Sequence, residues 1–113
     1  GALKGGRALY LEAKTTRKEV SPHRWVLPDR LRLPDAAHPD RGHQGQVLLQ
    51  AVQMGALGAV FLRCFDGAHA VDYLVPVGLE GSPALDVPSW SWEALEPYRV
   101  PSHGRWWDAL LTS

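Results

Sequence analysis

Two short apolar runs separated by a tight-turn signal constrain the fold of this chain more than any other feature. Residues Ala59–Phe65 (AVFLRCF) and Ala70–Pro76 (AVDYLVP) are rich in apolar, β-branched and aromatic side chains, and Asp66-Gly67 stands between them. An Asp-Gly pair in this position is typical of a β-hairpin, because glycine readily adopts the positive φ that a tight turn needs. The sequence therefore predicts two antiparallel, buried strands in the middle of the chain.

A strand and a helix are predicted before this hairpin. Gly1–Gly6 has the glycines of a turn, and Arg7–Thr15 (RALYLEAKT) alternates between apolar and polar residues as a half-buried strand does. We expect its core face to carry Leu9, Leu11 and Ala13, and its polar face Tyr10, Glu12 and Lys14. His43–Met54 has apolar residues at helical spacing. The order strand, helix, strand implies a right-handed βαβ unit with parallel strands.

The remaining segments carry weaker patterns. Thr16–Gly42 contains four prolines, which predicts a long connection with little regular structure, pinned by the apolar pieces Trp25–Leu27 and Leu31–Leu33. From Gly78 onward the chain is rich in proline and tryptophan, and only Gly104–Leu111 predicts a helix. We expect residues 78–113 to form an extension packed on the domain.

Length and composition bound the class of protein. The chain has 113 residues, of which 45% are hydrophobic and 21% charged, so we expect one α/β domain spanning residues 1–113. No apolar run is long enough to cross a membrane and no secretion signal opens the chain, which predicts a cytoplasmic protein. The single cysteine, Cys64, excludes an internal disulfide and an all-cysteine metal site.

The formal net charge of zero hides an asymmetry between two parts of the chain. Gly1–Pro34 carries eight Lys/Arg against three Asp/Glu, whereas Asp35–Ser113 carries four against nine. A basic segment of this kind indicates a surface that faces a polyanion, and a solvated face without a partner is the alternative. The candidate phosphate-binding residues of the basic segment are Lys4, Arg7, Arg17, Lys18 and Arg24.

Glu12-Ala13-Lys14 is the strongest chemical signal in the sequence. The two-residue period of a strand puts the Glu12 carboxylate and the Lys14 ammonium on one face. A carboxylate, with the Ala13 carbonyl beside it, can bind a hard divalent cation. The lysine can hold an attacking water and stabilise charge that develops on a phosphate. A structural ion pair is the alternative interpretation of the same spacing.

The residues around this motif resemble a known family of nucleases. Gly5–Thr15 (GGRALYLEAKT) is similar to the signature strand of the PD-(D/E)xK nucleases, and most similar to that of the RecU-type Holliday-junction resolvases. Downstream, His43-Gln44 opens a helix that leads into Ala59–Phe65, which ends in Arg63-Cys64-Phe65 and resembles the corresponding strand of that family. The resemblance covers about residues 1–76.

This resemblance implies both a fold and an activity. The fold is the restriction-endonuclease-like core of the PD-(D/E)xK superfamily, a mixed β-sheet flanked by helices. The activity is that of a Mg²⁺- or Mn²⁺-dependent endonuclease that cuts branched DNA, such as four-way junctions, as a homodimer. The family also has an aspartate as a second metal ligand, which would lie upstream of Gly1. The chain is therefore expected to lack the first strand and helix of such a nuclease, and to be inactive alone.

The resemblance also assigns roles to individual residues. Glu12 would be a metal ligand together with the Ala13 carbonyl, and Lys14 would position the attacking water. Gln44 would lie near the scissile phosphate, with His43 beside it at a helix N-terminus, where anions are favoured. A histidine at that position can reach a phosphate.

Two other functions remain open at this point. One is a nuclease of another PD-(D/E)xK branch, the replication-repair type, which also shows Glu-x-Lys followed by a helix. The other is a non-catalytic module that docks DNA through the basic segment. Trp25 beside Arg24 is a candidate for base stacking, whereas the four tryptophans of the extension are expected in the core or at an interface. The histidines between His23 and His43 lack zinc-site spacing.

Overall fold

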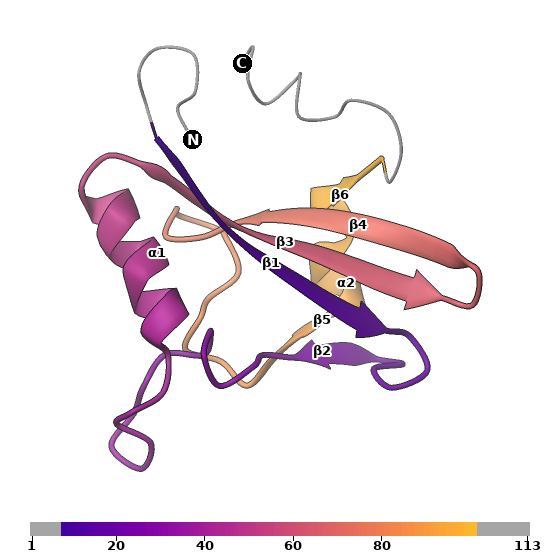
Figure 1. Ribbon diagram of the computed structural model, residues 1–113, viewed down its shortest axis with the longest axis horizontal. Coiled ribbons are helices and arrows are strands. Elements are labelled where there is room, and N and C mark those ends of the chain that lie inside the picture. The colour runs from indigo at the N-terminus through magenta and orange to yellow at the C-terminus, as the bar shows by residue number, and fades with distance from the viewer. Residues whose placement is uncertain (1–7, 102–113) are drawn as a thin grey trace.

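The computed structural model describes residues 8–101, which form a domain with two β-sheets (Figure 1). The larger sheet has the strand order β1-β3-β4-β6, in which β1 and β3 are parallel and the other neighbours antiparallel. The smaller sheet pairs β2 with β5. The strands are β1 (Leu9–Arg17), β2 (Arg24–Val26), β3 (Leu57–Asp66), β4 (His69–Pro76), β5 (Ser89–Ser91) and β6 (Arg99–Val100).

The helix α1 (His43–Gln53) connects β1 to β3 and packs against both strands. The predicted helix and the parallel pairing of the two strands around it are confirmed. Two short helical turns follow later in the chain, α2 (Trp92–Leu95) and η1 (Glu96–Tyr98). Within residues 8–101, no helix has the length and apolar character needed to cross a membrane.

The predicted hairpin is confirmed as β3 and β4, each longer than the apolar run that predicted it. Asp66 pairs with His69 at the turn, where Gly67 has a φ of +62°. A residue with a side chain is rarely found at this φ, which explains the glycine. The turn fixes the register of the whole hairpin, including the pairing of Arg63 with Asp72.

The core lies between one face of the larger sheet and the elements that cover it. Val60 and Val75 are fully buried on this face, and Leu48 of α1 packs in the same cluster. Trp25 of β2 and Trp90 of β5 complete the cover, with ring centroids 5.5 Å apart. Because both rings are buried, the small sheet anchors the long connection and the extension to the same core.

The connection from Thr16 to Gly42 is more regular than its prolines suggest, since it contains β2. Its apolar pieces do pin it, because Trp25, Leu27 and Leu31 are buried. Trp25 is only 4% exposed, so its interpretation as a base-stacking residue is wrong. The ring was misassigned because its sequence neighbour Arg24 is basic, whereas alternation along β2 turns the two side chains to opposite faces.

The described part of the extension packs on the domain through its tryptophans. The rings of Trp90 and Trp92 are both buried in the core. The indole N–H of Trp92 donates to the Ser21 carbonyl of the connection, and that of Trp90 donates to the Ala84 carbonyl within the extension, each at 2.7 Å. The short elements β5, α2, η1 and β6 were not predicted, because two to four residues carry no detectable periodicity. The turn expected at Gly1–Gly6 and the helix expected at Gly104–Leu111 lie outside the described residues.

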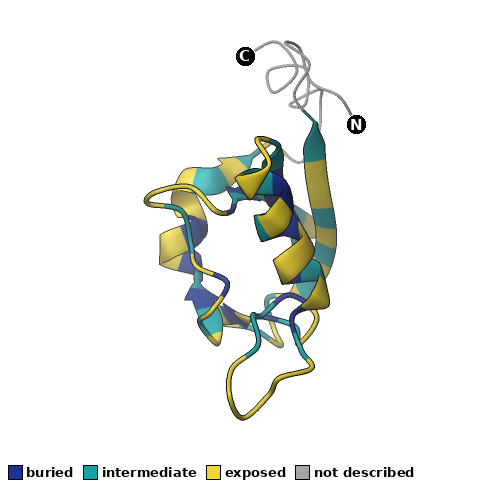
Figure 2. Ribbon diagram, turned by 90° about the vertical axis from the view of Figure 1, so that its left-hand side faces the viewer, coloured by how far each residue is buried: buried dark blue, intermediate teal, exposed yellow. Residues whose placement is uncertain are grey.

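The faces of β1 are the reverse of the prediction. Leu11 is 45% exposed and Ala13 is exposed, whereas Glu12 and Lys14 are half-buried, and the bands along β1 alternate accordingly (Figure 2). The parallel register explains this, because Glu12 pairs with Val60 and Lys14 with Leu62, both fully buried residues of β3. Register with the central strand, and not the polarity of β1 itself, decides which face is covered.

Candidate active site

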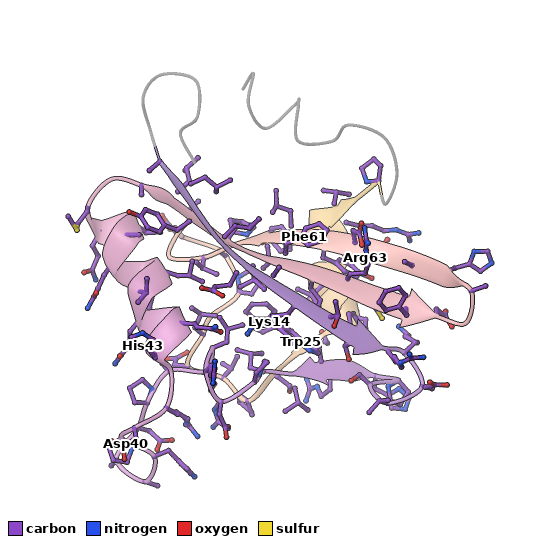
Figure 3. All side chains as sticks on the ribbon, viewed as in Figure 1. Lys14, Trp25, Asp40, His43, Phe61 and Arg63 are labelled. Carbon is purple, nitrogen blue, oxygen red and sulfur yellow. The ribbon has the colours of Figure 1, made fainter. Side chains whose placement is uncertain are left out.

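Glu12 and Lys14 lie on the covered face of β1, and only one of them has a partner. The Lys14 ammonium donates a hydrogen bond to Oε1 of Gln44 at 2.7 Å, across a sequence separation of 30 residues. The Glu12 side chain has no hydrogen bond or ion pair to any residue from 8 to 101. In Figure 3, Lys14 lies on the same side of β1 as Trp25, and His43 marks the beginning of α1.

Gln44 is held in place by the backbone around it. The amides of Gln44 and Gly45 donate to the Arg30 carbonyl at 2.9 and 3.3 Å, and the Gly42 amide donates to the Asp29 carbonyl at 2.8 Å. A side chain at Gly45 would collide with the Leu31 carbonyl, so this glycine permits the close approach. The first turn of α1 is thereby fixed, and Gln44 points at Lys14 from a rigid element.

The same bonds change the interpretation of His43. His43 is exposed at the first position of α1, as predicted. The backbone amides of the next two residues, Gln44 and Gly45, already donate to the Arg30 carbonyl. The exposed His43 imidazole is the side chain at this end of α1.

The hydrogen bonds at the two ends of the β1–β3 ladder show where the Ala13 carbonyl points. Leu57 N–H donates to the Ala8 carbonyl at 2.9 Å, and Lys18 N–H donates to the Phe65 carbonyl at 2.8 Å. In a parallel ladder every second residue bonds to the neighbouring strand. The even-numbered residues of β1 therefore bond to β3, and the odd-numbered Ala13 turns its N–H and C=O to the opposite edge. This carbonyl therefore makes no ladder bond to β3.

The donor atoms at Glu12 fit a magnesium ion that retains water. Mg²⁺ is usually held through one or two carboxylates, with waters and substrate phosphates as the other ligands. Glu12 supplies one carboxylate and Ala13 one carbonyl. No group of three His, Cys, Asp or Glu side chains within residues 8–101 is arranged to hold a metal.

A groove adjoins the Lys14–Gln44 hydrogen bond. It has a volume of about 650 Å³ and is lined by residues 29–30 and 37–44, so Gln44 belongs to both the groove and the bond. His43 lines its wall, and Asp40 lies in the loop below α1 (Figure 3). The other lining residues, 29–30 and 37–42, come from the connection before α1, where the sequence predicted no site.

The loop beneath the groove is held by the carboxylate of Asp35. Asp35 Oδ1 accepts the His38 amide at 2.8 Å, and Asp35 Oδ2 accepts from Arg41 at 2.7 Å. Burial acts to raise the pKa of Asp35, but the hydrogen bonds from His38 and the charge of Arg41 outweigh it and leave the pKa below its ordinary value. Asp35 is thus a structural acid that shapes the groove.

The predicted DNA-binding residues do not converge on one point. Arg17 and Arg24 are exposed, and Arg17 lies on the face of β1 opposite to Lys14. The Lys18 ammonium lies 4.7 Å from the centre of the Trp92 ring, a cation–π contact that holds it on the domain. Lys4 and Arg7 lie outside the described residues. Of the predicted site residues, the structure brings together Lys14, Gln44 and the adjacent Glu12 and His43.

A second charged pair lies on the other face of the sheet and was missed by the sequence analysis. Arg63 of β3 donates two hydrogen bonds to the Asp72 carboxylate of β4, at 2.8 and 2.9 Å. Asp72 is fully buried, and this contact raises the pKa of Arg63. The hairpin turn was the available signal, because it already sets Arg63 opposite Asp72.

Cys64 is buried on β3, in agreement with its interpretation as a small apolar residue. Burial raises the pKa of its thiol, which keeps it protonated and unreactive. A nucleophilic role for this cysteine is therefore not supported.

The described residues define a small α/β domain with a mixed four-stranded sheet and two short helices. No protein-family model, curated protein or solved structure matches this chain. Its chemically distinctive feature is the carboxylate and ammonium of Glu12 and Lys14, held beside Gln44 at the edge of the sheet.

Proposed function

We propose that this chain belongs to a metal-dependent DNA endonuclease of the PD-(D/E)xK type, similar to the RecU-type junction resolvases. The observation that carries the proposal is the Lys14–Gln44 hydrogen bond of 2.7 Å, which lies beside Glu12, a carboxylate without a partner among residues 8–101. The bond joins a strand and a helix that are 30 residues apart, in the order in which that family carries its Glu-x-Lys and Gln residues. If Glu12 and Lys14 formed only a structural ion pair, Lys14 would not need a hydrogen bond to Gln44.

In this proposal the metal is held by the Glu12 carboxylate and the Ala13 carbonyl, with waters and a DNA phosphate completing its ligands. When bound, such an ion polarises a phosphoryl oxygen and lowers the pKa of a coordinated water. A further carboxylate from outside residues 8–101 would strengthen the site. The family resemblance points to an aspartate for this role.

Lys14 acts next to the carboxylate. Its ammonium has three N–H donors, of which one is directed at Gln44, so the others can hold the attacking water and a phosphate oxygen. Because the site is half-buried, the positive charge stabilises developing negative charge more strongly than it would in water. Gln44 keeps the ammonium in position and excludes alternative rotamers of the lysine.

The DNA would approach along the groove and across the exposed basic residues. His43 and Gln44 line the groove. The exposed Arg24 offers a phosphate contact elsewhere on the domain, whereas Arg17 lies on the face of β1 opposite to Lys14. Branched DNA as the substrate and a homodimer as the active form are part of the proposal, and both come from the family resemblance.

A cleavage assay tests the proposal. A labelled four-way DNA junction is incubated with Mg²⁺ or Mn²⁺ and with this chain, or with the same chain extended upstream in its gene. Lys14→Ala is compared with Gln50→Ala, which removes an exposed glutamine from the same helix as Gln44. We expect cleavage by the extended form that Lys14→Ala abolishes and Gln50→Ala leaves intact. Metal-independent binding without cleavage in every form would refute the nuclease.

A second function is favoured by one observation. Within residues 8–101 no group of three or more His, Cys, Asp or Glu side chains is arranged to hold a metal, which is also expected of a non-catalytic DNA-binding module. In such a module Lys14 and the basic residues contact phosphates, and binding depends on salt and not on divalent metal. Junction binding that is unchanged by a metal chelator, with no cleavage by the extended chain, is the result that this alternative predicts.

A further inference from the structure

Both faces of the large sheet are apolar, although the core lies on only one of them. The strand pairing defines an outer face, formed by the side chains that alternate with those of the core. Its apolar residues are Leu11 and Ala13 of β1, Leu57, Ala59 and Phe61 of β3, and Leu74 and Pro76 of β4. None of these side chains belongs to the core cluster of the described residues. In Figure 2, β1 forms the right-hand margin of the described part, and α1 lies on its left, inner side.

This composition is typical of a sheet that is buried on both sides. A half-solvated sheet alternates apolar and polar residues along each strand, whereas β3 is apolar from Ala59 to Leu62 and β4 from Tyr73 to Pro76. The charged residues of the outer face, Arg63 and Asp72, are paired with each other. Apolar side chains that gather on one face in this way mark an interaction surface.

The chain itself supplies a segment at the edge of the outer face. Val100 of β6 pairs with Asp72, so its side chain lies on the same face. Residues 102–113 follow and lie outside the described residues. Within them the sequence predicts a helix over 104–111 that is apolar on one side and polar on the other. The apolar side would carry Trp106, Trp107, Leu110 and Leu111, and the polar side Arg105 and Asp108.

We propose that residues 104–111 pack as a helix on the outer face of the large sheet, with their apolar side directed at Phe61 and Leu74. Four strands span about 14 Å and an eight-residue helix is about 12 Å long, so the two lengths match. A cavity of about 220 Å³, lined by Leu57, Leu74 and Pro76 among others, adjoins this face and can take an apolar side chain.

The short tether favours this segment over a separate partner. Only residues 101–103 lie between Val100 and Gly104, and a short linker gives an effective concentration on the order of millimolar. The helix would lie on the face opposite to Glu12 and Lys14 and would not contact their side chains. The inference therefore goes beyond the nuclease proposal and does not depend on it.

A spin label tests which face is covered. The label is attached to Asp108→Cys, on the polar side of the predicted helix, in the full 113-residue chain. The native Cys64 is buried and is a poor target for the reagent. Because the broadening by the label falls steeply with distance, we expect the methyl signals of Leu11 and Leu74 to lose more intensity than those of Leu48 in the core.

A matched pair of variants tests the contact itself. Leu111→Asp puts a carboxylate on the apolar side of the predicted helix, whereas Thr112→Asp puts the same group at the next position, on the polar side. We expect Leu111→Asp to remove the selective broadening. It should also raise the equilibrium constant of unfolding about tenfold or more, as for the loss of one buried leucine. Thr112→Asp should leave both unchanged.

Three results would overturn the proposal. The first is equal broadening on both faces of the sheet, or none on either. The second is selective broadening that survives Leu111→Asp. The third is broadening that appears on isotope-labelled chains only when they are mixed with spin-labelled ones, because a second copy would then cover the face. A label at Asp40→Cys, in the loop below α1, is the positional control and should not select Leu11 and Leu74.

Discussion

The two faces of the large sheet each carry a basic and an acidic residue, and they use them differently. On one face Arg63 and Asp72 are joined by two hydrogen bonds, and the carboxylate is fully buried. On the other face Glu12 has no partner within residues 8–101, and Lys14 is bonded to a neutral amide. Arg63 and Asp72 therefore satisfy each other. The Glu12 carboxylate and two of the three N–H donors of the Lys14 ammonium have no partner within residues 8–101.

This difference distinguishes charged residues that stabilise the fold from charged residues that are able to bind a ligand. A buried carboxylate needs a partner that satisfies it, and Arg63 provides a bidentate one. A half-buried carboxylate without a partner retains its capacity to bind a cation, and a positioned ammonium retains its capacity to hold an anion. The comparison supports a stabilising role for Arg63 and Asp72, and it motivates the proposal that Glu12 and Lys14 bind ligands.

The largest effect on stability is expected when the ion pair between Arg63 and Asp72 is broken. Arg63→Ala leaves the Asp72 carboxylate buried and unpaired, a situation that costs about 3 to 5 kcal/mol in proteins. We expect a strong decrease in the urea midpoint of unfolding. The double variant Arg63→Met/Asp72→Leu, which replaces both charges with apolar side chains, should recover most of the loss.

A matched surface pair provides the control for this prediction. Arg99 and Glu96 form an exposed ion pair of 3.6 Å, and pairs of this kind contribute less than about 1 kcal/mol. Arg99→Ala should therefore have little effect on the urea midpoint. If Arg63→Ala lowered the urea midpoint as little as Arg99→Ala, the buried Asp72 carboxylate would not need Arg63 as its partner. This result would contradict the stabilising role given to the Arg63–Asp72 pair.

At Lys14 we expect a large effect on cleavage and a small effect on stability. Lys14→Ala should reduce junction cleavage by the extended chain about 100- to 1,000-fold, the typical effect of losing one group that stabilises transition-state charge. Its stability should fall by only about 1 kcal/mol, for one partly buried hydrogen bond. Cleavage and urea unfolding, measured on the same preparation, separate the two effects. Unfolding of Lys14→Ala would make the lysine structural and contradict this assignment.

A smaller effect is expected at Gln44, because it acts through Lys14. Gln44→Ala should reduce cleavage about tenfold, as expected when one positioning hydrogen bond worth about 1.4 kcal/mol is lost. Gln44→Glu provides a sharper test, since a carboxylate there can still accept from the ammonium and should retain more activity than alanine. Equal rates for both variants would show that Gln44 does not position Lys14.

Much of this fold could be predicted from the sequence, and the errors have a physical pattern. The hairpin, α1 and the βαβ order follow from periodicity and from the Asp-Gly turn. The faces of β1 could not be predicted from β1 alone, because the register with Val60 and Leu62 of β3 decides them. The short β2–β5 sheet depends on Trp25 meeting Trp90 across 65 positions of the chain, which no local pattern reveals.

The candidate site could be predicted in part. The strand period places Glu12 and Lys14 on one face, and the family resemblance singled out Gln44, which the structure sets 2.7 Å from the lysine. The groove between Asp29 and Gln44 could not be anticipated, because it depends on how the proline-rich connection folds back over α1.

The smallest effect concerns pH and the loop beneath the groove. The folded-state pKa of Asp35 is lowered, so its contribution to stability is present above the pKa of the unfolded state and disappears as the pH falls through the folded value. Asp35→Asn should therefore be slightly less stable than the wild type at neutral pH and equal to it in strong acid. Urea midpoints measured between neutral pH and about pH 2 test this, and an unchanged difference across that range would contradict it.

Manganese binding to the wild-type chain, followed by nuclear magnetic resonance, tests most directly whether Glu12 is open to a cation. Paramagnetic Mn²⁺ broadens the signals of nearby amides, so a titration locates the bound ion. We predict that the amides of Glu12, Ala13 and Lys14 broaden first, that those of Arg63 and Asp72 broaden later, and that Glu12→Gln removes the early broadening. Broadening that begins in the Asp35–Asp40 loop, or that survives Glu12→Gln, would contradict the assignment of Glu12 as the metal ligand.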